Sequence, residues 1–234
     1  MKTDEKEYIS QLRNRLVSEH ENPAEPMADF FSERVKIYDG IHLGRWHAEY
    51  ASFADYFRDG VSELLDIGCG TGLELESIFR RFPKARVTGI DISADMLKRL
   101  GEKYGGKNIE LINADYTEYP FENRRFDAVA QFESLHHFVY DEKQKIYGKI
   151  YKALKPGGQY VGCDYIARSE EGERLFLEEY RSRRERDGIP EGVLVHIDIP
   201  LTLEHETELI KKAGFKNIEV SDTDADTVII RAEK

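Results

Sequence analysis

The chain has 234 residues, and its 45 acidic residues outnumber 34 basic ones to give a formal net charge of −11. That length suits one large α/β domain with a small appendage. The charge argues against nonspecific nucleic-acid binding, which needs a basic face. The two cysteines, Cys69 and Cys163, form neither a disulfide framework nor a metal-ligand spacing. The charged N-terminus and the lack of a membrane-length apolar run complete the expectation of a cytoplasmic protein without a membrane span or a metal.

Residues 1–60 are expected to form an N-terminal helical segment or lid, ahead of a main domain over residues 61–234. Apolar stripes at helical spacing cross this segment. The stretch Asp39–Gly44 contains two glycines and is interpreted as a hinge-like loop. Tyr38, Arg45 and Trp46 lie at or near it, so we expect them close to a ligand. The alternative is that the aromatic side chains only pack onto the main domain.

A glycine turn follows the first predicted strand. The apolar run Leu64–Ile67 is interrupted by Asp66 and followed by alternating glycines at Gly68, Gly70 and Gly72. Apolar residues then recur at helical spacing, so the pattern predicts a buried strand, a tight turn and a helix. A helix N-terminus behind such a turn suits a carboxylate or phosphate. The acid before the glycines would repel a pyrophosphate and attract an ammonium group.

The next strand, Arg86–Ile90, ends at Asp91. An acid at this strand tip is placed to accept hydrogen bonds from ribose hydroxyls. Ser93 is a plausible N-cap for the following helix. Leu73 stands where the dinucleotide fingerprint carries its third small residue, which disfavours an NAD-linked oxidoreductase.

The segments LDIGCGTG (65–72), GIDIS (89–93) and LKPGG (154–158) together resemble motifs of class I S-adenosylmethionine (SAM) dependent methyltransferases. The resemblance implies a doubly wound three-layer α/β sandwich with a mostly parallel seven-stranded sheet in the order 3-2-1-4-5-7-6. The last strand would be antiparallel. It also implies SAM as cofactor and S-adenosylhomocysteine as product. The expected cofactor-binding residues are Asp66, Gly68, Cys69, Gly70, Asp91, Ile92, Met96, Asp115, Tyr116, Gln131, Tyr38 and Arg45.

Two of these residues follow later strands. Asp115 comes after the third predicted strand, Ile109–Ile112, where an acid of the family binds the adenine amino group. The alternative is a turn aspartate that accepts local backbone hydrogen bonds. Gln131 follows the fourth predicted strand, Phe126–Ala130.

The remaining elements complete the alternation of strands and helices. Helices are expected over residues 141–154, 169–187 and 204–213, with the second a solvated charged helix. A stop at residues 155–158 precedes a fifth strand over residues 159–163. Residues 189–200 are expected to be irregular, and a hairpin around residues 222–226 joins strands at residues 218–220 and 227–231.

Candidates for a general base follow the fourth strand, where the transferred methyl group should point. Glu133 and His136 are the predicted catalytic residues, with His137 beside them. A histidine with a pKa near neutrality can take a proton from an acceptor. The alternative is a histidine that is hydrogen-bonded into the junction after the strand. His196 and Asp198 form a second polar pair, for which a surface loop is the simpler interpretation.

The acceptor is only partly bounded by the sequence. The signature [DNS]-PP-[YFW] of amide and base-amine methyltransferases is absent after the fourth strand, and Gln131 stands where catechol methyltransferases place a metal-ligating aspartate. Aromatic residues in an acidic chain favour a small-molecule acceptor, polar or cationic. A SAM-binding protein without methyl transfer, either a sensor or a complex subunit, is the alternative function. The oligomeric state stays open.

Overall fold

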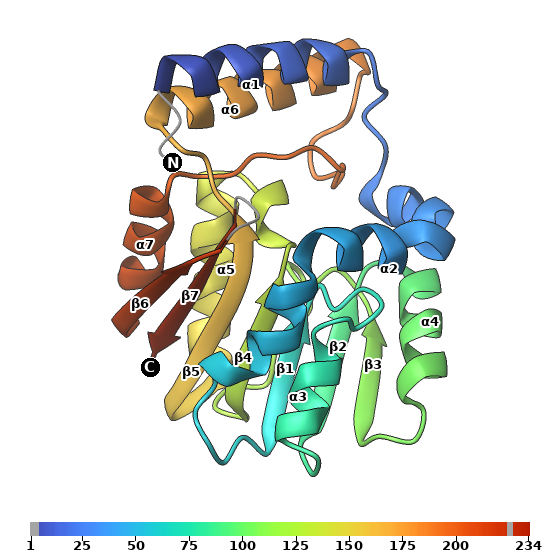
Figure 1. The fold of residues 1–234 in the computed structure, drawn as a ribbon, viewed down its shortest axis with the longest axis vertical. Coiled ribbons are helices and arrows are strands. Elements are labelled where there is room, and N and C mark those ends of the chain that lie inside the picture. The colour runs from blue at the N-terminus through green and yellow to red at the C-terminus, as the bar shows by residue number, and fades with distance from the viewer. Residues whose placement is uncertain (1–4, 224–226) are drawn as a thin grey trace.

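A computed structural model describes residues 5–223 and 227–234. Seven strands form one sheet in the order β3-β2-β1-β4-β5-β7-β6, which confirms the expected order (Figure 1). β7 is antiparallel to both of its neighbours, and the other pairs are parallel. The strands are β1 (Glu63–Ile67), β2 (Arg86–Asp91), β3 (Ile109–Asn113), β4 (Phe126–Phe132), β5 (Leu154–Tyr165), β6 (Lys216–Asp222) and β7 (Thr227–Glu233).

Helices cover both faces of this sheet, so the predicted three-layer sandwich is confirmed. Alternate residues of a strand point to opposite faces: Leu64 packs toward α3 and α4, whereas Leu65 packs toward α5 and α7. The helices are α1 (Glu5–His20), α2 (Met27–Ser52), α3 (Leu75–Arg81), α4 (Ala94–Tyr104), α5 (Tyr140–Ala153), α6 (Glu170–Arg186) and α7 (Leu203–Lys212), with 3₁₀ turns η1 (Phe53–Tyr56) and η2 (Leu135–His137).

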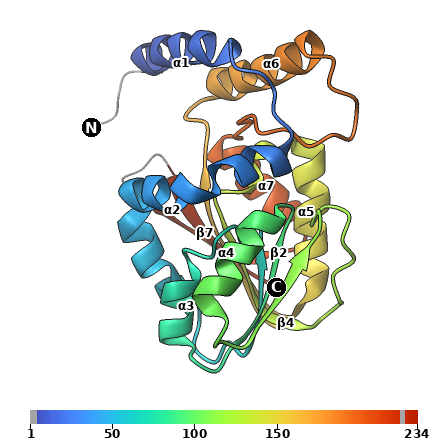
Figure 2. The ribbon, with the colours of Figure 1, turned by 90° about the vertical axis from the view of Figure 1, so that its right-hand side faces the viewer.

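The first helix does not lie on the sheet. α1 runs beside α6, beyond the carboxyl end of β5 (Figures 1 and 2). Its apolar stripe of Ile9, Leu12 and Leu16 packs against Leu175 and Phe176 of α6. The charge of α6 was interpreted as a solvated face, and most of its charged side chains are at least partly exposed. Its apolar residues lie on the other face and are buried against α1, because burial of apolar surface is favourable. This contact joins the N-terminal segment, residues 1–60, to the main domain, residues 61–234.

The predicted loop at Asp39–Gly44 is helical. α2 continues through it and carries its only non-helical backbone at Trp46, with φ −121° and ψ 31°. A glycine inside a helix costs only about 1 kcal/mol relative to alanine. Packing of α2 against α3 and α4 is enough to offset that cost.

Two smaller boundaries also differ from expectation. β4 runs on to Phe132, so that Gln131 lies inside the strand. Residues 155–158 begin β5 rather than forming a loop, and Lys155 there pairs with Asp127 of β4 at 2.6 Å. The β6–β7 hairpin is present, but residues 224–226 of its predicted turn lie outside the described residues. In the described parts of the chain, no helix is both long and apolar enough to cross a membrane.

Candidate functional site

A pocket of about 560 Å³ lies against the glycine turn, beyond the carboxyl ends of β1 and β2. This is where open α/β sheets bind ligands. Most of the predicted cofactor residues line it, and Glu133 and several apolar side chains complete the wall. The predicted residues that line the pocket are Tyr38, Gly68, Gly70, Asp91, Ile92, Met96, Asp115 and Tyr116.

Asp91 is fixed at the pocket wall by backbone donors on both of its oxygens. The Gly70 N–H donates to Oδ2 at 2.9 Å and the Ser93 N–H donates to Oδ1 at 2.8 Å. Burial raises the pKa of Asp91 to about 6, although these two hydrogen bonds favour the charged form. Gly68 and Gly70 both adopt positive φ, 64° and 48°. Their backbone therefore follows a path that other residues rarely adopt.

Two further acids are buried behind the turn. Asp66 is fully buried, and neither of its carboxylate oxygens has a hydrogen-bond partner among the described residues. Burial, and then the charge of Glu74, raise the pKa of Asp66 well above its usual range. Burial also raises the pKa of Glu74 to about 7. A cation bound on this side of the pocket would therefore be stabilised by the two carboxyl groups.

Asp115 shows both features considered from the sequence. Its Oδ1 accepts hydrogen bonds from the backbone N–H and the hydroxyl of Thr117, at 2.8 and 2.7 Å, as a turn aspartate does. The residue also lines the pocket, beside Tyr116.

Besides the buried Asp66, three predicted cofactor residues do not line the pocket. Gln131 is buried in β4, where its Nε2 donates to Asp164 at 2.9 Å and its Oε1 accepts from Tyr160 at 3.1 Å. The Cys69 side chain is buried beneath Gly89. Arg45 lines a second cavity instead.

This second cavity, called the chamber below, has a volume of about 890 Å³ and adjoins the pocket. Phe31, Tyr38, Glu133 and His137 line both spaces. The other chamber residues come from α1, α2, η2, the end of β5 and the stretch that holds His196 and Asp198. The surface-loop interpretation of this last pair is therefore wrong, because Ile197 and the residues around it fold back onto η2.

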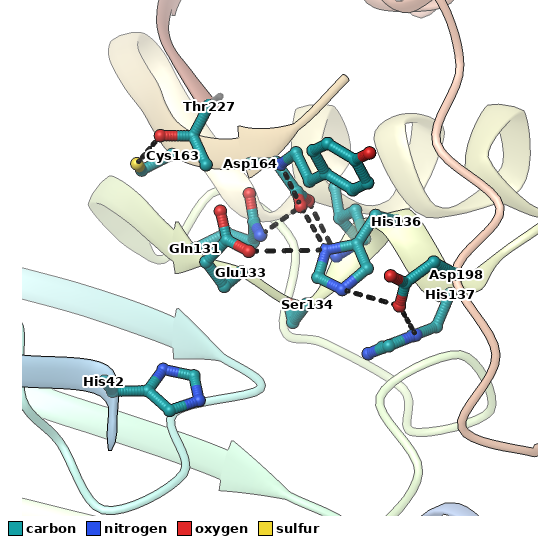
Figure 3. A network of polar contacts seen from close by, with 12 residues as sticks. His42, Gln131, Glu133, Ser134, His136, His137, Cys163, Asp164, Asp198 and Thr227 are labelled. Atoms are coloured by element: carbon teal, nitrogen blue, oxygen red, sulfur yellow. Dashed lines mark hydrogen bonds and ion pairs between the residues drawn. The ribbon is translucent and has the colours of Figure 1, made fainter. Parts of the chain in front are cut away.

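His136 is the centre of a buried polar network at the chamber wall (Figure 3). Its Nδ1 lies 2.5 Å from Asp164 Oδ1, and its Nε2 lies 3.7 Å from Asp198 Oδ1. Asp164 also accepts hydrogen bonds from Gln131 and from the backbone N–H groups of Leu135 and Tyr165. These partners fix the carboxylate, which in turn fixes the imidazole ring.

The network holds protons up to alkaline pH. Burial lowers the pKa of His136, but the charge and the hydrogen bond of Asp164 outweigh burial and raise it to about 9. Burial raises the pKa of Glu133 to about 8, and its Oε1 has no hydrogen-bond partner in the described chain. Burial also lowers the pKa of both His42 and His196 to about 4, so these imidazoles are neutral at pH 7.

Two sets of donors in the network come close enough to hold a cation. They are His136, His137 and Asp198, and Glu133, His136 and Asp164. The donor atoms are already engaged, however: Nδ1 of His137 faces the Ile197 carbonyl oxygen at 3.2 Å, and Asp164 accepts four hydrogen bonds. The arrangement is therefore described better as a proton-holding network.

Asp164 was missed by the sequence reasoning. The predicted fifth strand stopped at Cys163, one residue short of it, whereas β5 runs on to Tyr165. The available signal was an acid at the carboxyl end of a strand, the same position that singled out Asp91. Phe31 and Ser134 of the pocket wall carried no such signal.

Comparison with known proteins agrees with this geometry. A family described as a methyltransferase domain matches residues 64–158. An uncharacterized methyltransferase of Geobacillus kaustophilus is 30% identical over 162 residues, which cover 66% of this chain and 74% of the relative. A carboxy-S-adenosyl-L-methionine synthase of Nautilia profundicola is 26% identical over 215 residues, 85% and 91% of the two chains.

The chain is a class I SAM-dependent methyltransferase. Human N-acetylserotonin methyltransferase, solved in complex with SAM, shares the fold with a TM-score of 0.67 at 20% identity. That match covers 97% of this chain and 66% of the human one. Across the curated relatives, this methyltransferase spans from 42% to 91% of their own lengths.

The residues of the pocket fit SAM. The cofactor carries an ammonium and a sulfonium group. In the described chain, Oε1 of Glu133 at the pocket wall and both carboxylate oxygens of Asp66, which is buried behind that wall, have no hydrogen-bond partner. Gly70 has no side chain, so a ligand can approach its backbone directly. A Cβ placed at Gly70 would contact only the Tyr38 side chain, 3.6 Å from the hydroxyl oxygen. Acidic walls and an open glycine turn suit a cationic nucleoside.

Proposed function

We propose that this methyltransferase transfers a methyl group to a small-molecule acceptor bound in the chamber. The observation that carries the proposal is the shared wall: Phe31, Tyr38, Glu133 and His137 line both the pocket and the chamber. Two ligands in these spaces would therefore lie against each other. Placing two reactants in contact supplies much of the acceleration of such a transfer.

Different residues would bind the different parts of SAM. Asp66 would hold the ammonium group, Asp91 the ribose hydroxyls, and Asp115 with Tyr116 the adenine. When bound, SAM supplies an electrophilic methyl carbon whose leaving group departs uncharged. No protein acid is then required for the leaving group.

His136 and Glu133 are the proposed catalytic pair. Asp164 holds the Nδ1 side of the His136 ring, which leaves Nε2 facing the chamber as the atom that would accept a proton. Both groups must release a proton before they can act, since their pKa values are raised to about 9 and about 8. Positive charge in the adjoining pocket would lower both values and so favour the basic forms.

Residues 1–60 are proposed to form the cover of the site. α2 supplies Phe31 and Tyr38 to the shared wall, and α1 supplies Arg15 to the chamber. A cytoplasmic location is also part of the proposal, supported by two buried free thiols, Cys69 and Cys163.

Calorimetric titration of SAM tests the cofactor assignment. Asp91→Ala should weaken binding by about 1.5–3 kcal/mol, or on the order of 10- to 100-fold, because hydrogen bonds to a charged group are lost. Asp95→Ala removes an exposed acid of α4 nearby and serves as the matched control. If the folded Asp91→Ala protein bound SAM with unchanged affinity, the assignment of Asp91 to the ribose hydroxyls would be wrong.

A screen of small metabolites for S-adenosylhomocysteine release tests the acceptor class. The expected result is methyl transfer to at least one small molecule, and the His136→Gln substitution should suppress this transfer. Turnover only with protein or nucleic-acid substrates would contradict the proposal.

A further inference from the structure

The chamber is bordered by three arginines, although the chain as a whole carries a charge of −11. Two of them are neutralised by carboxylates. Arg15 donates to Glu19 at 2.7 Å and to Asp198 at 2.8 Å. Arg34 donates to both oxygens of Glu25, at 3.0 and 2.9 Å.

Arg45 has no such partner. Among the described residues it forms neither an ion pair nor a hydrogen bond, and its guanidinium lies 4.6 Å from the centre of the Trp46 ring. Its charge nevertheless reaches the chamber wall, because it helps burial to lower the pKa of His42 and offsets a small part of the rise that burial causes in the pKa of Glu133. A free guanidinium fork therefore borders this cavity.

A second donor beside Arg45 is also unsatisfied. Trp46 is 7% exposed and lines the chamber, yet its indole Nε1–H has no acceptor in the described chain. Buried donors are normally paired, and an unpaired one costs free energy. The buried, unpaired indole donor lies next to the exposed guanidinium of Arg45, and this arrangement indicates that a ligand supplies the acceptor.

The remaining wall near these donors is uncharged. Phe31 and Tyr38 contribute aromatic surface, and His42 is neutral at pH 7. Asp198, the chamber's ionised acid, is already paired with Arg15. The end of the chamber at Arg45 thus has positive charge and apolar surface, but no free carboxylate of its own.

We propose that the methyl acceptor carries a carboxylate, which Arg45 and Trp46 bind, on an aromatic or otherwise apolar body. The planar fork of arginine matches a carboxylate with two parallel hydrogen bonds. The reacting group of the acceptor then lies toward His136 and Glu133. This inference rests on the proposed function, and of the expected polar or cationic acceptors it favours a polar, anionic one.

Trp46 makes the test direct, because it is the only tryptophan of the chain. Its fluorescence is titrated with benzoate, benzamide and benzylamine, three probes of similar size that differ in charge, with S-adenosylhomocysteine present. The expected result is a saturable change with benzoate at a concentration about 10-fold lower than with the other two, since only benzoate brings a negative charge and two equivalent acceptor oxygens to the guanidinium.

Three variants assign the preference to Arg45. Arg45→Gln should abolish the preference for benzoate, and Arg45→Lys, which keeps the charge but loses the fork, should retain part of it. Arg181→Gln is the matched control, because Arg181 is exposed on α6 away from the chamber. Both positions are exposed at the surface of the structure, and thermal unfolding checks that each variant is folded.

Several outcomes overturn the inference. They are tighter or equal binding of benzamide or benzylamine, absence of benzoate binding up to its solubility, or an unchanged preference in Arg45→Gln. Calorimetric titration of S-adenosylhomocysteine on the same preparations separates the two proposals. If S-adenosylhomocysteine does not bind, the proposed function fails; if it binds and benzoate is not preferred, only the carboxylate inference fails.

Discussion

The protonation of His136 depends on one carboxylate, that of Asp164. Burial by itself would lower the pKa of the imidazole, so the value near 9 is due to the neighbouring negative charge and the 2.5 Å contact. Asp164→Asn should therefore lower the pKa of His136 by removing the charge that stabilises the imidazolium. Long-range ¹H–¹⁵N spectra over a pH series measure this value directly.

The matched control is Asp127→Asn, which removes a carboxylate of β4 that pairs with Lys155 and not with His136. In that variant the titration of His136 should stay where it is. If the pKa of His136 were the same in wild type and Asp164→Asn, the network would not set the basicity of the ring. Methyl transfer should rise with pH up to about 9 in the wild type, because His136 is a base only after losing its proton.

Sequence reasoning found the residues whose roles follow from strand ends. Asp91 and Asp115 could be placed because an acid after a predicted parallel strand must lie at the carboxyl edge of the sheet. Gln131 was expected just after the fourth strand, but β4 continues two residues beyond the predicted end at Ala130 and includes Gln131. Asp164 and Trp46 depend on contacts between distant segments, which the local pattern of one chain does not specify.

The continuity of α2 leads to a prediction about two glycines. Gly40 and Gly44 have negative φ, and a Cβ at either position would meet nothing within 4 Å. Gly40→Ala and Gly44→Ala should each stabilise the protein by about 1 kcal/mol, or raise Tm by roughly 2–4 °C, since alanine favours the helix. Thermal unfolding with and without SAM measures both stability and binding, and binding should be unchanged.

Gly68→Ala is the contrasting variant. Its backbone has φ 64°, and a Cβ would lie 2.7 Å from the Ser134 side chain, so this substitution should lower Tm. A loss of stability in Gly40→Ala or Gly44→Ala would restore the idea that Asp39–Gly44 works as a loop.

At the level of elements, the sheet and the helices that alternate with its strands were predictable, whereas the continuity of α2 and the pairing of α1 with α6 were not. Buried parallel strands have a strong local signature, and β1 and β2 lie where their apolar runs predicted. Glycine is only a weak signal against a helix when tertiary packing supports it. The pairing of α1 with α6 joins segments about 160 residues apart, and the high charge of α6 concealed its apolar face.

The whole molecule should lose stability as pH rises from 7 to 9 in the absence of ligand. Glu74, Glu133 and His136 have pKa values of about 7, 8 and 9 in the folded state, each above its ordinary value. The folded chain therefore binds more protons than the unfolded chain in this window. Linkage then requires the free energy of unfolding to fall as pH increases.

Urea unfolding at pH 7, 8 and 9 measures the trend, with SAM present in a parallel series. The stabilisation by SAM should grow with pH, because its cationic groups favour the ionised carboxylates. His42 and His196, whose pKa values are lowered to about 4, change protonation below this window. Increasing stability of the free protein from pH 7 to pH 9 would contradict the assignment of the buried acids.

The position of β7 has a consequence for how the chain acquires its structure during synthesis. β7 comprises residues 227–233 but lies between β5 and β6, inside the sheet. Until these residues leave the ribosome, β5 presents an unpaired edge with a run of buried residues, and such edges promote intermolecular pairing. The apolar stripe of α1 is likewise uncovered until α6 has been synthesised, about 150 residues later. A nascent chain of this methyltransferase therefore leaves the apolar stripe of α1 uncovered until α6 has been translated, and the edge of β5 unpaired until residues 227–233 have been translated.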